Sequence, residues 1–192
     1  MHRSTLAFCF LAFSRTIFAQ SNAISELDHL LQGVETLSAD ITQLIIQSDG
    51  GVLEESDIRL RVKRPNGFYW ETVSPFPELL VTNGKTLWNY QPDLEQVVIE
   101  DWNPDQSELA AQLLYGRTEG LVKDYYVVAI NSEQSRSFEL KPKSADSLYD
   151  LITINFVNET LDLIYIQNNS GERTAWQFID SRINIPMVDD LF

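Results

Sequence analysis

The sequence predicts a mainly β protein with a few helices, in which a single curved antiparallel sheet forms an open half-barrel covered by a helical lid. About ten segments alternate apolar with polar residues, which is the period of a strand with one buried face. Turn residues separate these segments at short intervals, as in the hairpins of an antiparallel sheet. Only residues 23–37 and 107–115 have the apolar spacing of helices. These helices are the natural cover for the concave side of the sheet, which would otherwise expose a large apolar patch.

The first helix is expected over residues 23–37. Ser21 or Asn22 can cap its N-terminus. Leu27 and Leu31 belong to its apolar stripe, and we expect them to face the inside of the half-barrel and to contact an apolar ligand there. The whole stripe consists of Ile24, Leu27, Leu31, Val34 and Leu37.

Strands are expected along most of the remaining chain, after the period changes to two near Ala39. Asn83-Gly84 is the strongest turn signal, because this dipeptide favours a tight hairpin. Arg64-Pro65-Asn66-Gly67 marks another turn. No internal repeat and no linker interrupts the pattern, so we expect one domain. The expected strands are 58–63, 68–73, 79–82, 85–90, 94–102, 125–130, 137–140, 151–156, 161–167 and 173–179.

The first residues have the layout of a secretory signal peptide. His2 and Arg3 precede the apolar run 6–13, and Ile17-Phe18-Ala19 offers a cleavage point after Ala19. The apolar run is much shorter than the ~20 residues that a membrane-spanning helix needs. We therefore expect residues 1–19 to be removed and residues 20–192 to form a single exported domain. A buried or membrane-anchoring N-terminal helix is the alternative.

Composition excludes several kinds of function. The 28 acidic residues outnumber the 14 basic ones, which argues against nucleic-acid binding. The single cysteine, Cys9, lies within the expected signal peptide, so no metal site built on several cysteines is expected. His29 is then the one remaining histidine, and no Gly-x-Ser-x-Gly motif accompanies it. We expect neither an enzyme nor a protein with a metal or another cofactor.

Aromatic residues are concentrated between residues 68 and 102. Phe68, Trp70, Trp88 and Tyr90 are the members that we take as candidates for the wall of an apolar cavity. Core packing alone also uses such residues, and this interpretation stays open. A twisted half-barrel under a lid, however, encloses space that its own side chains do not fill. An exported protein with such a space suggests a lipid carrier.

Several longer blocks of residues are specific, and they occur in one order along the chain. They are Ser38-Ala39-Asp40-Ile41-Thr42-Gln43, Val62-Lys63-Arg64-Pro65-Asn66, Phe68 with Trp70, Leu80-Val81-Thr82-Asn83-Gly84-Lys85-Thr86-Leu87-Trp88-Asn89-Tyr90, Leu94-Glu95-Gln96 and Phe138-Glu139-Leu140-Lys141-Pro142-Lys143. In this order and separation, the blocks closely resemble the LolA family of periplasmic outer-membrane lipoprotein carriers. The similarity extends from about Ala23 to Ile179.

The resemblance implies a monomeric periplasmic carrier whose cargo is acylated lipoproteins. An inner-membrane ATP-driven complex would release the cargo to it, and LolB, a receptor anchored in the outer membrane, would accept the cargo. Arg64 would hold the lid closed through hydrogen bonds to backbone carbonyls of the lid. Leu113 or Leu114 on the lid and Ile164 on a late strand would contact the acyl chains. LolB has a lipid-modified cysteine at its mature start, which this chain lacks, so the carrier is favoured over the receptor.

The sequence departs from the family at two places. The family shows Thr-Pro before its lid helix, where this chain has Ser107-Glu108. The family also ends with a Phe-rich strand and a Pro-Pro-Gly-type segment, whereas this sequence stops at Asp189-Asp190-Leu191-Phe192. We therefore expect that last strand or tail to be absent.

Two other classes of function stay open beside the carrier. One is a periplasmic sensor of lipids or lipopeptides, or a glycolipid carrier, built on the same half-barrel. The other is an enzyme that acts on acyl chains, which the lack of a paired nucleophile and base disfavours.

Overall fold

The computed structural model of the protein describes residues 13–103, 113–116 and 119–192. In these residues, eleven strands form the body of the molecule, with α-helices and short 3-10 helices beside them. The helices are α1 (Phe13–Gln32), α3 (Glu119–Asp124), η1 (Pro92–Leu94) and η3 (Asp189–Leu191). The strands are β1 (Thr36–Ile46), β2 (Val52–Lys63), β3 (Gly67–Ser74), β4 (Glu78–Thr82), β5 (Thr86–Gln91), β6 (Gln96–Asp101), β7 (Tyr125–Asn131), β8 (Ser135–Pro142), β9 (Tyr149–Val157), β10 (Thr160–Asn168) and β11 (Arg173–Ile183).

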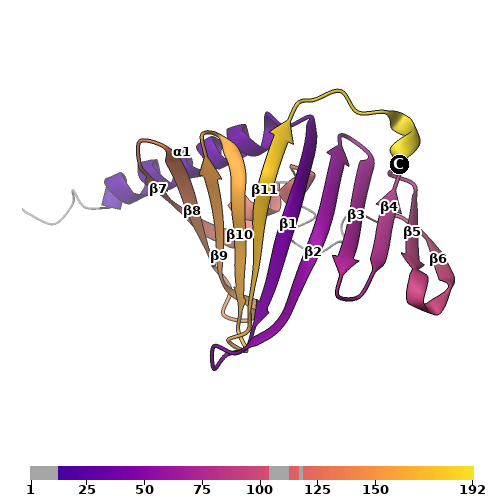
Figure 1. The fold of residues 1–192 in the computed structure, drawn as a ribbon. Coiled ribbons are helices and arrows are strands. Elements are labelled where there is room, and N and C mark those ends of the chain that lie inside the picture. The colour runs from indigo at the N-terminus through magenta and orange to yellow at the C-terminus, as the bar shows by residue number, and fades with distance from the viewer. Residues whose placement is uncertain (1–12, 104–112, 117–118) are drawn as a thin grey trace, which may run out of the picture.

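All eleven strands belong to one antiparallel sheet, in the order β6-β5-β4-β3-β2-β1-β11-β10-β9-β8-β7. Two series of hairpins meet where β1 pairs with β11 (Figure 1). The edge strands β6 and β7 lie at opposite ends of this order, so the sheet is open rather than closed. The predicted fold class, a mainly β protein with one open antiparallel sheet, is confirmed.

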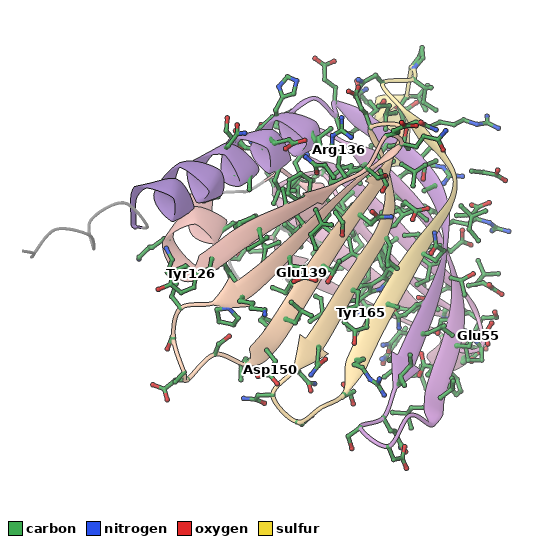
Figure 2. All side chains as sticks on the ribbon, turned by 90° about the vertical axis from the view of Figure 1, so that its left-hand side faces the viewer. Glu55, Tyr126, Arg136, Glu139, Asp150 and Tyr165 are labelled. Carbon is green, nitrogen blue, oxygen red and sulfur yellow. The ribbon has the colours of Figure 1, made fainter. Side chains whose placement is uncertain are left out.

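Helix α1 covers one half of the sheet. In Figure 1 it lies across the strands at the β7 end, and strands β3 to β6 extend beyond it. We call the side of the sheet that α1 contacts the inner face, and the opposite side the outer face. An ion pair of 3.0 Å between Arg136 Nε on β8 and Glu26 Oε1 joins the helix to the sheet, and Figure 2 shows Arg136 beneath the helix.

The predicted helix over residues 23–37 was wrong at both ends. Helix α1 begins at Phe13, so Ser21 and Asn22 lie within it and do not cap its N-terminus. Gly33 donates its backbone N–H to the carbonyl oxygen of His29 at 3.0 Å, and the helix ends at Gln32. Leu37 belongs to β1, where it lies opposite Val62 on the inner face. The apolar stripe continued past the end of the helix because Leu37 is buried against the same core from a strand. The removal of residues 1–19 stays a prediction.

The predicted lid helix over residues 107–115 lies mostly outside the described residues. Leu113 and Leu114 are helical and buried, and Gly116 follows them in a turn with a positive φ of 71°. Sequence analysis did not predict the short helix α3, which lies between this segment and β7.

The core lies between α1, the segment 113–116 and the inner face. Phe138 and Phe156 form an edge-to-face pair at 6.0 Å between ring centres on β8 and β9. Leu27 and Leu31 of α1 are buried against the same cluster. The central strands alternate buried inner residues with outer ones, as the period of two predicted. Hydrophobic burial on this face is the main contribution to stability.

The last residues fold back over the turn between β2 and β3. Lys63 Nζ donates to the carbonyl oxygen of Met187, at 2.6 Å, and to the carboxylate of Asp189. The ring of Phe192 lies against Gly67, where an added Cβ would be 2.8 Å from ring atoms. The C-terminal segment therefore packs beside the turn that carries Arg64.

We predict that neighbouring valines on β7 differ strongly in their effect on stability. Val127 is 1% exposed on the inner face, whereas Val128 is 55% exposed on the outer face. Val127→Ala should lower the free energy of unfolding by about 2–3 kcal/mol, because it leaves a cavity in the core. Val128→Ala should lower it by about 1 kcal/mol or less, the loss of strand preference alone. Urea denaturation measures both, and equal losses would contradict the assignment of the faces.

Candidate functional site

The inner face carries an open cavity of about 910 Å³ on the part of the sheet that α1 leaves uncovered. Its volume lies within the range of pockets that bind small molecules. Its described lining residues are Gln43, Ile45, Glu54, Ser56, Phe68, Trp70, Thr72, Phe76, Glu78, Leu80, Leu87, Glu100, Asp101, Trp102, Asn103, Tyr149, Ile166, Asn168, Glu172, Thr174 and Trp176. Strands from both series of hairpins therefore contribute to one space.

Two of the predicted cavity residues line this space. Phe68 and Trp70 lie on β3, side by side on the inner face, with their ring centres 6.1 Å apart. Their spacing of two residues places both side chains on one face of the strand. They form the aromatic part of the cavity wall together with Trp102, which follows β6.

Trp88 and Tyr90 do not line the cavity, contrary to the prediction. They alternate along β5 with Leu87, which does line it. Trp88 pairs with Val81 across the ladder and Tyr90 pairs with Leu79, so both aromatic side chains lie on the outer face. The two rings are part of the same sequence block as Leu87, but the register of the β4–β5 hairpin turns them away from the site.

The remaining predicted contacts belong to the packed core and are absent from the described lining of the cavity. Leu27 and Leu31 on α1, Leu113 and Leu114 before Gly116, and Ile164 on β10 are each less than 5% exposed. Their buried surfaces contact one another and the sheet. They belong to the same core cluster as the wall residues Phe68, Ile166 and Trp176, and the sequence alone did not distinguish this position from the wall itself.

Several wall residues were not predicted from the sequence, and Trp176 is one of them. It lies on β11, opposite Gln43 of β1, and its indole N–H donates to Gln43 Oε1 at 2.7 Å. Leu80 and Ile166 are further examples, on β4 and β10. Strand alternation was the signal available for them, because each lies two residues from another residue of the inner face.

Arg64 contacts the segment 113–116 directly. Its Nη2 donates a hydrogen bond of 3.1 Å to the carbonyl oxygen of Leu114. Burial lowers the pKa of Arg64 from its usual value, although a guanidinium stays charged in a protein. The guanidinium lies against Gly116, where an added Cβ would be 2.5 Å from Nη2. Only a glycine leaves room for this close approach.

Two further contacts hold the same segment. Gln32, the last residue of α1, donates from Nε2 to the carbonyl oxygen of Gly116 at 2.7 Å. The ring of Tyr115 stacks on Phe68, with 5.5 Å between centres, and lies 5.9 Å from Trp102. The segment thus joins the end of α1, the turn after β2 and the aromatic wall of the cavity.

The described lining of the cavity combines apolar and aromatic side chains with amides, hydroxyls and carboxylates. Histidine and cysteine are absent from the described lining of the cavity. Within residues 13–103, 113–116 and 119–192, no cluster of three or more His, Cys, Asp or Glu side chains is arranged to hold a metal ion. No helix in the same residues combines the length and the apolar character needed to cross a membrane. Apolar contact and hydrogen bonding are what the cavity wall supplies.

Solved structures of other proteins share the fold. An uncharacterized conserved protein from Thermus thermophilus matches with a TM-score of 0.56 and 12% sequence identity, over 89% of this chain and 91% of that chain. A chain in the complex of Pseudomonas aeruginosa MucA and MucB matches with a TM-score of 0.51 and 14% identity, over 89% of this chain and 60% of that chain. At such low identities the likeness concerns the fold alone.

Proteins with higher sequence identity to this chain indicate its family. A protein of Chromohalobacter salexigens is 33% identical over 174 residues, which are 91% of this chain and 83% of that protein. One from Coxiella burnetii is 31% identical over 182 residues, covering 94% of this chain and 86% of that protein. Both are named outer-membrane lipoprotein carrier protein. The family profile described as outer membrane lipoprotein carrier protein LolA matches residues 32–192. The chain therefore belongs to the LolA family of outer-membrane lipoprotein carrier proteins.

Proposed function

We propose that the protein is a periplasmic carrier that binds the acyl chains of lipoproteins in its cavity and transfers them from the inner membrane to an outer-membrane receptor. The observation that carries this proposal is the open cavity of about 910 Å³, with an aromatic wall, in a chain of the lipoprotein-carrier family. An ATP-driven inner-membrane complex supplies the cargo, and the receptor is LolB. The protein acts as a monomer, without a cofactor and without catalysis, after residues 1–19 have been removed.

The openness of the cavity suits reversible binding. Burying an acyl chain stabilises the complex by roughly 0.8 kcal/mol for each CH₂ group. Complete enclosure of several long chains would therefore make release too slow for a carrier. A wall formed by Phe68, Trp70 and Leu80 on one side, with the other side open, covers the chains only in part. Binding is then strong enough for transport through water and weak enough for transfer.

Arg64 acts as a latch on the segment 113–116 in this mechanism. Its bond to the Leu114 carbonyl has a charged donor, and such bonds contribute about 1.5–3 kcal/mol. Tyr115 adds its stacking on Phe68. Cargo that needs the space near Phe68 has to displace Tyr115, and it thereby loosens the latch. Closure of the latch after release favours the empty protein, which drives the cargo toward the receptor.

A purified lipoprotein carrying a fluorescent label tests the proposed function. Mixed with the protein in detergent-free buffer, it should form a soluble complex that survives gel filtration. Mass spectrometry should find the cargo chemically unchanged. Release of free fatty acid or of a cleaved peptide would identify an enzyme instead, and cargo that aggregates regardless of the protein would contradict the carrier.

We predict that Arg64→Leu traps the cargo. The variant keeps the cavity wall and should bind an acylated lipopeptide at least as tightly as the unmodified protein. Loss of the bond to Leu114 removes the stabilisation of the closed, empty form, so transfer to the receptor should fall about tenfold or more. Arg59→Leu, on the outer face of β2, the strand that precedes Arg64, is the matched control and should transfer normally. Normal transfer by Arg64→Leu would remove the latch from the mechanism.

We predict that Gly116→Ala reproduces the Arg64→Leu phenotype from the other side of the contact. The new Cβ would lie 2.5 Å from Arg64 Nη2, so the guanidinium has to move away from the segment. Gly50→Ala is the control, because Gly50 also has a positive φ, of 95°, but has no atom within 4 Å of an added Cβ. Both changes cost roughly 1–2 kcal/mol of backbone strain. Transfer assays that rank the two variants alike would mean that strain, not displacement of Arg64, causes the defect.

A further inference from the structure

The wall of the cavity changes from apolar to polar along the strands. We call the part lined by Phe68, Trp70, Leu80, Leu87 and Trp102 the apolar end, although Glu100, Asp101 and Asn103 also line the cavity beside Leu87 and Trp102. The other part, which we call the polar end, contains most of the side chains able to accept hydrogen bonds, although Ile45, Ile166 and Tyr149 line it too. The polar side chains of this end are Gln43, Glu54, Ser56, Thr72, Glu78, Asn168, Glu172 and Thr174.

The change occurs on five neighbouring strands, within one inner-face position from each strand to the next. Going from the apolar end to the polar end along the inner face, the next residue after Ile58 on β2 is Ser56, and the next residue after Ile41 on β1 is Gln43. These residues are cross-strand partners, Ile41 with Ile58 and Gln43 with Ser56. The equivalent steps on the other strands are Trp70 to Thr72 on β3, Leu80 to Glu78 on β4 and Trp176 to Thr174 on β11. The boundary shifts by one inner-face position between β2 and β3, where Thr72 pairs with Ile58, and between β1 and β11, where Trp176 pairs with Gln43. It therefore crosses the five strands diagonally, and it is a property of the cavity and not of one residue.

The polar end presents acceptors and negative charge. Ser56 is 2% exposed, and its hydroxyl donates to Glu54 Oε1 at 2.8 Å, which orients that carboxylate. Asn168 Nδ2 donates to Glu172 Oε1 at 3.3 Å. Because a carboxylate offers about four lone-pair sites, one such bond leaves capacity for a ligand. Lysine and arginine are absent from the described residues that line the cavity.

We propose that the polar end binds the first peptide residues of the lipoprotein, through their backbone N–H groups and cationic side chains, while the acyl chains lie on the apolar end. This inference rests on the proposed function and adds the orientation of the cargo and its chemical class. Glu54 and Glu172 attract a peptide segment with lysine or arginine. They repel an anionic lipid headgroup, which finds no positive partner in the described wall. The cavity therefore selects peptide-bearing cargo over anionic phospholipids of the same membrane.

Synthetic lipopeptides with one acyl group and three different peptides test this orientation. The peptides are Ser-Lys-Lys-Lys-Lys, Ser-Gln-Gln-Gln-Gln and Ser-Glu-Glu-Glu-Glu, and tryptophan fluorescence measures their dissociation constants at low and high salt. The protein should prefer the lysine peptide to the glutamate peptide by roughly fivefold or more at low salt, as expected for two partly screened charge pairs. High salt should reduce this preference.

The decisive comparison is between two double variants that change net charge equally. E54Q/E172Q removes two of the three carboxylate charges of the polar end, leaving Glu78, and should lower the preference by at least half, while its affinity for the glutamine peptide stays within about twofold. E55Q/E133Q is the control, because both side chains are exposed and lie outside the cavity. Figure 2 labels Glu55 on β2, where it is the neighbour of Glu54 on the opposite face. This control should keep the full preference.

The outcomes separate this inference from the proposed function. If the glutamine lipopeptide binds but E55Q/E133Q loses the preference as much as E54Q/E172Q, overall charge is responsible and the polar end has no role. The absence of any charge preference overturns the inference in the same way while the carrier function stands. If none of the lipopeptides binds, the proposed function fails and the inference fails with it.

Discussion

An open sheet of eleven strands has a larger inner face than one helix of ordinary length covers, and the cavity is a consequence of this mismatch. Where α1 and the segment 113–116 lie on the sheet, side chains such as Leu27 and Phe138 interlock and leave almost no exposed surface. Beyond them the same inner face continues into the open cavity, which Trp70 and Leu80 line. In a closed barrel or a sandwich, those side chains would have been part of the core.

The proposed latch lies at the boundary between the packed half of the inner face and the half that carries the cavity. Leu113 and Leu114 belong to the packed side, and Tyr115 reaches the aromatic wall of the hollow side. Arg64 and Gln32 bind the backbone carbonyls of the same segment from two different elements. Backbone carbonyls are acceptors of fixed position, so this contact has two states, made or broken. Because this contact lies at the edge of the cavity and is either made or broken, it is suited to linking the presence of cargo in the cavity to the release of that cargo.

In the proposed carrier, the two ends of the cavity divide binding into two physical contributions. The apolar end supplies affinity in proportion to the buried hydrocarbon area, and it does not discriminate among acyl chains. The polar end, with Glu54 and Glu172, adds little affinity in water but opposes ligands with the wrong charge. A carrier that works between membranes full of phospholipid needs such discrimination more than it needs additional affinity.

Much of this architecture is readable in the chain because hydrophobic periodicity and turn residues act locally. The period of two along β2 and β9, and Asn83-Gly84 before β5, predicted the hairpins of an antiparallel sheet. The block around Arg64 predicted membership of the LolA family, which the family comparison confirmed. Phe68 and Trp70 were predicted as cavity residues because aromatic residues are concentrated between residues 68 and 102, and both line the cavity.

Other features depend on how distant segments meet. The alternation along β5 shows that Leu87 and Trp88 lie on opposite faces of the strand. The β4–β5 register and the position of α1 decide that Leu87 is the one that faces the cavity. Leu37 fits a helical stripe and a strand equally well, and only its pairing with Val62 decides between them. The polar end exists because residues far apart in the chain, such as Glu54 and Thr174, which lie opposite Ile45 on its two sides, come to one level of one face. Local sequence sets the period of each element, whereas the choice of face, the register and the covering layer arise only when the strands assemble.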